Sequence, residues 1–307
     1  MKYTFIVNPK ASSGNGELIW NQIAPELMKR QVEYEVRFTD PVHGATKVAA
    51  DITADGGEHT LVVVGGDGTM NEVVNGICDC GKVTLGCIPT GSGNDFVRAV
   101  HLPKDAMRAR EGVLRQERTV ALDVGEMMCG GEKHRFAVST GIGFDAAVCH
   151  QVAVTKLKSL LNKFKAGSLI YLGIALQRLM KEPLVNCRLI LDGGEPKNFA
   201  KTYFVAVMNH PYEGGGFFFC PKAEIGDGCL DVIVVSALSR LKVLFLLPTA
   251  FFGKHVNFKG VDVYRCKEAE IELEQPLPVH TDGEVIPAAD KMTVSLCGAQ
   301  ARLIVAG

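Results

Sequence analysis

The sequence predicts a two-domain protein, with an N-terminal α/β domain built on an open, parallel-rich sheet and a second domain rich in β-strands. Three observations predict this fold class. The chain has 307 residues, which is more than one hydrophobic core usually organises. Apolar strands alternate with helix-length segments up to residue 88. Beyond about residue 125, strand-like segments follow one another between glycine-rich or charged turns.

The elements of the first domain alternate as an open α/β sheet requires. We expect strands at 4–7, 33–38, 61–64 and 84–88, and helices at 17–30, 45–54 and 71–77. The strand from Leu61 to Val64 is apolar throughout, which is typical of parallel strands that are covered on both faces. Such sheets bind ligands at the carboxyl ends of their strands, so the loops that follow the strands are the first candidates for a site.

The second domain is expected to hold strands at 135–139, 187–191, 202–208 and 229–235. The segment 294–305 is strand-like as well. Pattern alone does not decide whether that segment completes the second domain or returns to the first.

Composition and charge narrow the class of protein. The 33 basic and 34 acidic residues leave a formal net charge of −1, which disfavours a nucleic-acid-binding protein because such proteins gain affinity by neutralising phosphates. There is no secretory signal and no apolar run near the ~20 residues of a spanning helix, so a cytoplasmic protein is expected. The ten cysteines should then be reduced. Cys78 and Cys80 lack the second pair that a zinc site would need.

Three loops rich in glycine and small polar residues each follow a predicted strand. They are Asn8 to Gly16, Gly65 to Thr69 and Pro89 to Phe96. Because the carboxyl ends of parallel strands share one edge of the sheet, we expect the loops to converge there. Glycine lets backbone N–H groups approach an anion closely, and a helix N-terminus adds partial positive charge. The loops therefore predict a phosphate-binding site, with tight strand-to-helix turns as the structural alternative.

Asp67, in the middle loop, adds a metal to this prediction. A carboxylate repels phosphate unless a divalent cation lies between them, so Asp67 favours Mg²⁺ coordination. The sequence contains neither a G-x-x-x-x-G-K-[ST] loop nor a G-x-G-x-x-G fingerprint with a ribose-binding acid. A nucleoside triphosphate site of another kind is therefore favoured over a Walker-type or dinucleotide site.

Further motifs occur in order along the chain. They are Val7-Asn8-Pro9 with Ser13-Gly14, GGDGT at 65–69 followed by Asn71-Glu72, PTGSGNDF at 89–96, LDVG at 122–125, GIGFD at 141–145, GGG at 214–216, PKAEIGDGCLD at 221–231 and DGE at 282–284. With this set, which spans nearly the whole chain, the sequence resembles the soluble bacterial diacylglycerol kinase-like lipid kinases. That family is similar to sphingosine and ceramide kinases and, more distantly, to NAD kinases and phosphofructokinases.

The resemblance implies an ATP-binding α/β domain at 1–125 plus about 293–307, resembling NAD kinase and phosphofructokinase, and a β-sandwich at 126–292 that receives the lipid. It also implies an active site in the cleft between them, with ATP and Mg²⁺ bound there. The residues that would bind ATP are Asn8, Lys10, Ser12, Ser13, Gly14, Thr39, Gly65, Gly66, Asp67, Gly68, Thr69, Asn71, Glu72, Thr90, Gly91, Ser92 and Asn94. Ser92 stands where many relatives carry threonine, which keeps the hydroxyl.

Acidic residues take the metal and catalytic roles that the resemblance implies. Asp67, Asp95 and Asp123 would organise Mg²⁺, partly through water, which makes Asp67 a catalytic residue as well. Glu284 would be the base that accepts the proton of the lipid hydroxyl. From the residues alone, the segment from Thr281 to Glu284 also suits a hairpin turn.

A second, structural metal site is implied by the resemblance in the loop from Glu224 to Cys229. Asp227 would give a side-chain oxygen, and Glu224 and Cys229 would give backbone carbonyls. This chain has Gly226 where many relatives carry an acid or asparagine, which counts against the second metal.

Contact with membranes is predicted from two stretches without acidic residues. The stretch between Asp145 and Glu182 holds four lysines at 156–165 among leucines at helical spacing, which is typical of amphipathic segments that bind anionic phospholipid headgroups. The stretch between Asp231 and Asp262 is also basic and apolar, with an ordinary core helix as the alternative. The segment 214–219 could form part of an acyl-chain cleft or a buried strand entry, and His210 could line that cleft or cap a turn.

The leading hypothesis is an ATP- and Mg²⁺-dependent lipid kinase that phosphorylates the hydroxyl of diacylglycerol to give phosphatidic acid. Phosphatidylglycerol, another lipid alcohol and a sphingoid base stay open as acceptors. An NAD kinase is disfavoured because the chain reads Asn94-Asp-Phe-Val after the loop at 89–93. The intact acids argue against a regulator without catalysis. We expect a cytoplasmic enzyme that meets its lipid substrate transiently at the membrane surface, and a homodimer stays open.

Overall fold

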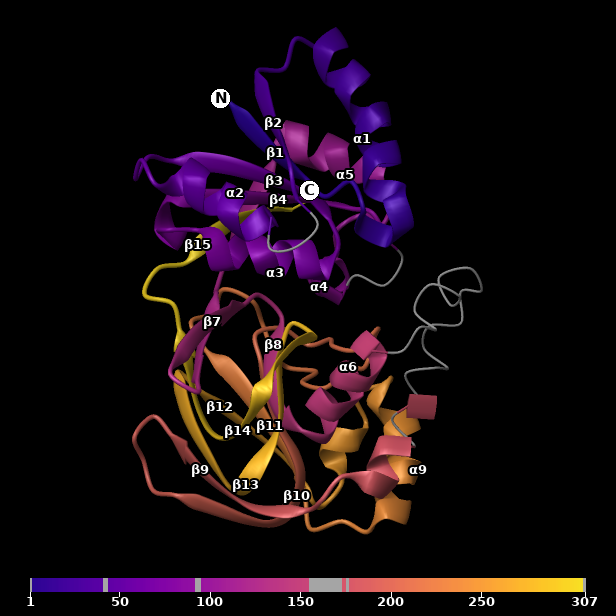
Figure 1. Ribbon diagram of the computed structural model, residues 1–307, viewed down its shortest axis with the longest axis vertical. Helices are drawn as coiled ribbons and strands as arrows, with labels where there is room; N and C mark the ends of the chain where they lie inside the picture. The colour runs from indigo at the N-terminus through magenta and orange to yellow at the C-terminus, as the bar shows by residue number, and fades with distance from the viewer. Residues whose placement is uncertain (1, 41–43, 92–94, 155–172, 175–176, 306–307) are drawn as a thin grey trace. The chain divides into compact units, whose positions relative to one another are not determined.

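The computed structural model describes residues 2–40, 44–91, 95–154, 173–174 and 177–305 (Figure 1). The chain forms two compact units. Unit 1 comprises Met1–Val124, Ile225–Asp227 and Cys297–Gly307, and unit 2 comprises Gly125–Glu224 and Gly228–Leu296. Each unit is described by itself. No helix in the described part of the chain is long and apolar enough to cross a membrane.

Unit 1 is built on a six-stranded sheet with the strand order β2-β1-β3-β4-β15-β5. Its strands are β1 (Tyr3–Val7), β2 (Tyr34–Phe38), β3 (His59–Gly65), β4 (Val83–Pro89), β5 (Arg118–Leu122) and β15 (Ala301–Val305). Its helices are α1 (Ala11–Lys29), α2 (Gly44–Thr53), α3 (Asp67–Gly76), α4 (Asp95–Ala99) and α5 (Ala106–Arg115), with a 3₁₀ turn η1 (Cys80–Lys82). All neighbouring strands are parallel except β15 and β5.

Burial explains why these segments form a sheet. The apolar run of β3 is fully buried from Leu61 to Val64, as both-face coverage requires. On one face, Trp20 and Ile23 of α1 and Val113 of α5 pack against the strands in a single hydrophobic cluster. The predicted start of the third helix was late, because α3 begins at Asp67. The range of α1 includes the non-helical residues Ser12, Ser13 and Gly14, so its regular part begins close to the predicted start at 17. The pattern also missed α5 and β5, in which charged residues are mixed with apolar ones.

Unit 2 is built on a nine-stranded antiparallel sheet with the order β12-β11-β10-β8-β13-β14-β6-β7, in which β9 also pairs with β10 and β13. Its strands are β6 (Gly125–Cys129), β7 (Glu132–Phe136), β8 (Ser139–Gly143), β9 (Val185–Leu191), β10 (Lys197–Met208), β11 (Leu230–Ser236), β12 (Val261–Cys266), β13 (Glu268–Thr281) and β14 (Glu284–Leu296). The short strands β8 and β9 both lie between the longer strands β10 and β13, where each pairs with a different part of their length.

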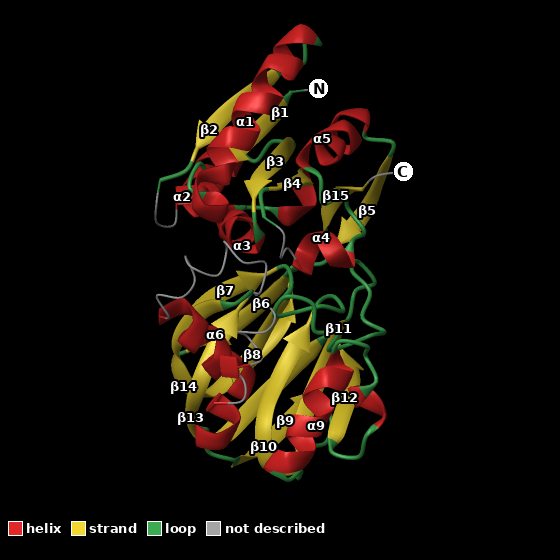
Figure 2. Cartoon of the chain, turned by 90° about the vertical axis from the view of Figure 1, so that its right-hand side faces the viewer, coloured by secondary structure: helices red, strands yellow, loops and turns green. Residues whose placement is uncertain are grey.

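The sheet of unit 2 folds over itself as a sandwich. Met127 and Phe136, near one edge, share a hydrophobic cluster with Val232 of β11, near the other. A second cluster lies on the opposite face of β10 and β11, where α6 (Phe144–Val154) and α9 (Arg240–Ala250) cover the strands (Figure 2). A 3₁₀ turn η2 (His255–Asn257) follows α9. Because α6 and α9 lie on the same face, the space between them and the sheet is enclosed by apolar side chains.

The end of the chain resolves what its pattern left open. Val294 to Leu296 complete β14 of unit 2, and β15 then joins the sheet of unit 1, so the strand-like segment 294–305 contributes to both units. The N–H of Cys297 donates to the carbonyl of Val124 over 2.8 Å, which ties together the two points where the chain passes between the units. The three residues Ile225–Asp227 also belong to unit 1, although the sequence had placed them within the second domain.

Candidate active site

The three glycine-rich loops meet at the carboxyl ends of β1, β3 and β4. The side-chain amide of Asn8 donates to the Thr69 hydroxyl over 3.1 Å, which joins the first loop to the second. The N–H of Thr90 donates to the Gly65 carbonyl over 3.1 Å, and the Asn15 amide donates to the Thr90 carbonyl over 2.6 Å. These hydrogen bonds join the three loops at one edge of the sheet, as predicted. Ser92 and Asn94 lie outside the described residues.

Helix α3 begins inside the middle loop. Gly66 is extended and precedes the helix, so Asp67, Gly68 and Thr69 form its first turn. The N–H groups of a first helical turn have no acceptor within the helix, and the helix dipole makes this end favourable for anions. The loop therefore offers Gly68 and Thr69 amides to a phosphate.

The first loop has an unusual backbone. Ser12, Ser13 and Gly14 follow one another in the left-handed region with φ of 50°, 63° and 96°. Two of the three are not glycine, and such conformations cost free energy that is typically stored at functional sites. Ser12 and Ser13 are exposed beside this turn, and Lys10 is exposed at the start of the loop. A basic group, two hydroxyls and the amides of the turn are thus available to an anionic ligand.

Three other predicted nucleotide ligands lie at different depths. The Thr39 hydroxyl, after β2, is buried and has no hydrogen-bond partner among the described residues. Asn71 is buried in α3, and Gly91 is half-buried after the Thr90 turn. Glu72 has a different role, because one of its carboxylate oxygens accepts the N–H of Ala45 over 2.9 Å. That bond satisfies an amide in the first turn of α2, so Glu72 supports the fold of unit 1.

The three acids that the resemblance assigned to Mg²⁺ already have protein partners. Asp67 accepts the N–H groups of Asp95 and Phe96 over 2.9 and 3.3 Å and so holds the start of α4. Asp95 is buried and pairs with Arg98 over 2.8 Å, and Asp123 accepts from Gln300 over 2.8 Å. These contacts orient the three carboxylates. The donor set of hard oxygens fits Mg²⁺.

The loop at 224–229 shows why this chain has glycine at position 226. Gly226 has a φ of 75°, and a Cβ atom there would lie 2.2 Å from the carbonyl oxygen of Ala121. Its own carbonyl accepts from Gln300 over 3.1 Å. The acid or asparagine of other family members would therefore clash here. Glu224, Asp227 and Cys229 are partly or fully exposed, and metal binding by this loop stays a prediction.

Glu284 begins β14 directly after a two-residue hairpin turn. Thr281 and Glu284 are paired across the turn, and Asp282 and Gly283 have the positive φ values, 48° and 80°, that such turns require. The Asp282 carboxylate accepts the N–H groups of Ala137, Val138 and Ser139 over 2.8 to 2.9 Å. The turn is therefore held rigidly, and it presents the exposed Glu284 at its end. The hairpin interpretation is correct, and a catalytic role for Glu284 stays a prediction.

Unit 2 contains an apolar cavity between α6, α9 and the sheet. Most of its walls are aliphatic or aromatic, and they include Phe144, Phe204, Phe217, Phe219, Val243 and Leu246. The loop at 214–219 thus contributes directly, with Phe217 stacked on Phe251 at a ring distance of 4.2 Å. His210 does not line the cavity. It is fully buried, its Nδ1 accepts the N–H of Tyr212, and burial lowers its pKa to about 3.

The sequence analysis did not identify a cluster of three ionisable residues at this cavity. Asp145 and Glu213 line it, and both lie next to the ring of His280, which is fully buried. Each residue stands beside a motif that was recognised, namely GIGFD, GGG and DGE. Their sequence separation hides the association, which the pairing of β8 with β13 creates.

Two family profiles match the chain. The profile described as "Diacylglycerol kinase catalytic domain" covers residues 2–127, and the profile described as "YegS C-terminal NAD kinase beta sandwich-like domain" covers residues 137–301. The chain is also 31% identical over 288 residues to "Putative lipid kinase YtlR" of Bacillus subtilis, with 92% of this chain and 93% of that protein covered. The chain belongs to the diacylglycerol kinase-like lipid kinase family. It is therefore a phosphotransferase.

Other likenesses agree with this membership. The diacylglycerol kinase of Mycobacterium tuberculosis is 28% identical over 284 residues, with 92% of this chain and 88% of that protein covered. A Bacillus anthracis structure described as "a putative diacylglycerol kinase" has a TM-score of 0.77 at 24% identity and covers 99% of this chain and 95% of its own. An NAD kinase from Archaeoglobus fulgidus in complex with ATP has a TM-score of 0.53 at 12% identity, covering 99% and 93%. The structures confirm the predicted fold class, an α/β domain followed by a β-sandwich.

Proposed function

We propose that this family member is an ATP- and Mg²⁺-dependent lipid kinase, with the hydroxyl of diacylglycerol as the leading acceptor and phosphatidic acid as the product. The observation that carries the proposal is the apolar cavity of unit 2. A phosphotransferase acting on a sugar or on NAD has no use for a cavity walled by phenylalanine and aliphatic side chains, whereas acyl chains gain free energy by filling it.

The nucleotide is assigned to unit 1. The first-turn amides of α3, the left-handed turn at Ser12 to Gly14 and Lys10 would hold phosphates. The buried hydroxyl of Thr39 has no hydrogen-bond partner within the described part of the chain and could bind the nucleotide as well. Asp67, Asp95 and Asp123 would hold Mg²⁺, which neutralises phosphate charge during transfer. Asp67 also fixes the start of α4, so its loss would disturb the loop as well as the metal.

The acceptor is assigned to unit 2. Acyl chains would lie against Phe217, Phe219 and Leu246. The hydroxyl must lose its proton as phosphoryl transfer proceeds, and Glu284 is the proposed base. Its turn is fixed by Asp282, so the carboxylate is presented with little loss of conformational freedom.

A membrane-facing surface on unit 2 supports a lipid acceptor. Helix α9 is apolar on both sides. Val243 and Leu246 line the cavity, whereas Leu241 and Phe245 on the outer side are 69% and 76% exposed. Phe252, just after the helix, is 73% exposed. Large exposed apolar side chains gathered on one element mark an interaction site.

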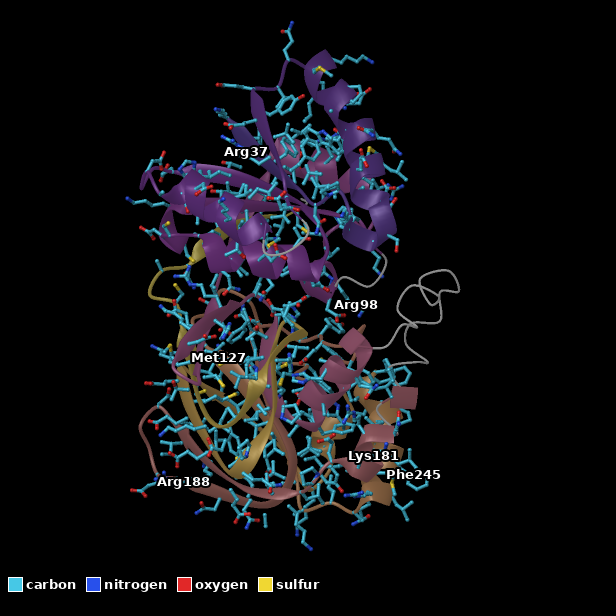
Figure 3. The ribbon with its side chains drawn as sticks, in the orientation of Figure 1. Arg37, Arg98, Met127, Lys181, Arg188 and Phe245 are labelled. Atoms are coloured by element: carbon cyan, nitrogen blue, oxygen red, sulfur yellow. The ribbon has the colours of Figure 1, made fainter. Side chains whose placement is uncertain are left out.

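The charge around this surface is positive. Lys181, Lys242, Lys254 and Lys259 are exposed on or beside it. Arg240 donates to the carbonyls of Met180 and Glu182, which joins the start of α9 to the helical turn at 177–181. Lys181, at the end of that turn, and Phe245 of α9 are labelled in Figure 3. Glu182, the neighbouring acid, is paired with Arg178 over 2.9 Å. Exposed apolar groups among lysines suit an anionic bilayer surface. The predicted docking segment at 156–165 lies outside the described residues.

An acceptor panel tests the proposal. The purified protein is incubated with labelled ATP, Mg²⁺ and one acceptor at a time: diacylglycerol, phosphatidylglycerol, sphingosine or NAD. We expect label in the lipid phase and none in NADP. Transfer to phosphatidylglycerol or sphingosine in place of diacylglycerol would keep the lipid kinase and change its acceptor. Transfer to NAD alone would refute the proposal.

A further inference from the structure

Three ionisable side chains are buried together at the wall of the cavity. Asp145 begins α6, Glu213 lies in the loop after β10, and His280 lies in β13. The Nε2 atom of His280 is 3.2 Å from Asp145 Oδ2 and 3.1 Å from Glu213 Oε1. The residues are 7%, 6% and 0% exposed, respectively. Burial of three ionisable side chains costs free energy of solvation, so the side chains need hydrogen bonds or ion pairs that compensate.

The backbone around the group is shaped to hold it. A Cβ atom on Gly141 would lie 2.1 Å from Asp145 Oδ2 and 2.7 Å from His280 Nε2, so only glycine leaves room for this pair. Thr140 donates to the His280 carbonyl over 2.8 Å. The N–H of Gly283 donates to His280 Nδ1 over 3.3 Å, which places the imidazole proton on Nε2, between the two carboxylates.

Each carboxylate keeps one oxygen unused. Asp145 Oδ1 and Glu213 Oε2 are buried and have no hydrogen-bond partner among the described residues. An unsatisfied buried acceptor of this kind is destabilising, because it has lost its hydrogen bonds to water. Both residues line the apolar cavity, so a molecule that fills the cavity is placed to supply the missing donor.

A metal ion does not fit this group. Cys149 brings a third type of donor atom within 4.8 Å of Glu213 and His280. However, the Nε2 atom of His280 carries the proton and has no lone pair for a metal. Burial also raises the pKa of the Cys149 thiol to about 12, so a metal ion would have to displace that proton as well. Burial, with a smaller contribution from Glu213, raises the pKa of Asp145.

We propose that Glu213 binds a hydroxyl of the acceptor lipid at the wall of the cavity, and that Asp145 and His280 are positioning residues that hold its carboxylate. This inference rests on the proposed function and sharpens it. The hydroxyl that is phosphorylated must give its proton to the base, so the donor held by Glu213 is a second hydroxyl. Diacylglycerol has one free hydroxyl and would bind as an acceptor without this contact. The inference therefore predicts that a lipid alcohol with two hydroxyl groups binds this cavity more tightly than one with a single hydroxyl.

Equilibrium binding to a matched pair of lipids tests the proposal without turnover. The probes are monooleoylglycerol, which has two hydroxyls, and the monooleoyl ester of 1,3-propanediol, which lacks the second. We expect the full-length protein to bind the first about 10-fold more tightly, since a hydrogen bond to a charged group is worth about 1.5–3 kcal/mol. Glu213→Gln should remove most of that preference. Glu126→Gln, which removes a carboxylate paired with Lys133 and Arg135 elsewhere in unit 2, should keep it.

The outcomes separate this inference from the proposed function. Equal affinity of the unaltered protein for the two lipids would overturn the inference even if diacylglycerol is phosphorylated, and it does not require any variant to fold. A preference that survives in Glu213→Gln would also overturn it. A preference that disappears in Glu213→Gln, in a protein that transfers no phosphate to lipids, would support the site and refute the kinase.

Discussion

Asp282 and Glu284 lie two residues apart in one hairpin, and the structure gives them separate tasks. Asp282 accepts three backbone N–H groups, whereas Glu284 is exposed. Asp282→Asn should lower the free energy of unfolding of unit 2 by about 2–4 kcal/mol, because an amide cannot replace a charged acceptor for three donors. Asp290→Asn, on the exposed side of β14, is the matched control and should change stability little. Denaturant unfolding measures both, and an equal effect of the two variants would contradict this role.

Glu284→Gln should have the opposite profile. Its fold and nucleotide affinity should stay unchanged, because Glu284 caps no helix and lies outside unit 1. Its rate of phosphoryl transfer should fall by about 100-fold or more, the usual contribution of a general base. Isothermal titration with an ATP analogue and an initial-rate assay give the two readouts. A rate close to that of the unaltered protein would remove Glu284 from the mechanism.

At the level of single elements, the short segment at 225–227 is fixed by its fit against unit 1. Gly226→Asn should lower the stability of unit 1 by about 1–3 kcal/mol, because its Cβ would collide with the Ala121 carbonyl. Gly228→Asn is the matched control. Gly228 has almost the same φ, 74°, but nothing lies within 4 Å of the position of its Cβ. Similar losses in both variants would show that backbone conformation alone, and not the close approach, accounts for the glycine.

The predicted contact with membranes depends on the exposed apolar residues of helix α9 and the turn after it. Replacing Phe245 and Phe252 with serine should weaken binding to vesicles that contain phosphatidylglycerol by about 10-fold or more, since each exposed ring would lose its burial in the bilayer. Leu18→Ser and Met28→Ser on α1 remove side chains of similar exposure, 61% and 62%, and should leave binding unchanged. Co-sedimentation at two salt concentrations measures this. Equal losses in the two pairs would refute a specific surface on α9.

At the scale of the whole molecule, buried His210 makes stability depend on pH. Its pKa falls to about 3 in the folded state, so the unfolded chain binds one more proton between that pH and about 6.5. The free energy of unfolding of unit 2 should therefore fall by about 1.4 kcal/mol for each pH unit below 6.5, relative to His210→Gln. Amide hydrogen exchange in β10 measures the difference. A pH dependence that is the same in both proteins would contradict neutral burial of His210.

The sequence predicted the order of the first four strands and three helices of unit 1 and the meeting of three loops, because both follow from period, glycine content and parallel topology. The sequence could not show that Glu72 accepts a hydrogen bond from the Ala45 N–H. A glutamate with that role and a glutamate that faces a nucleotide look the same in a sequence. Glu213 and His280 went unnoticed for another reason. Their association with Asp145 is created by strand pairing between distant segments, which no local pattern encodes.

The central claim is that the terminal phosphoryl group of ATP moves to a lipid hydroxyl. ATP labelled with heavy oxygen on its terminal phosphate, incubated with the protein, Mg²⁺ and mixed micelles of diacylglycerol and monoacylglycerol, tests this directly when the lipid phase is analysed by mass spectrometry. We predict a phosphorylated lipid that carries the heavy oxygen atoms and that is absent with Glu284→Gln. Heavy oxygen confined to inorganic phosphate, with none in any lipid, would contradict the claim.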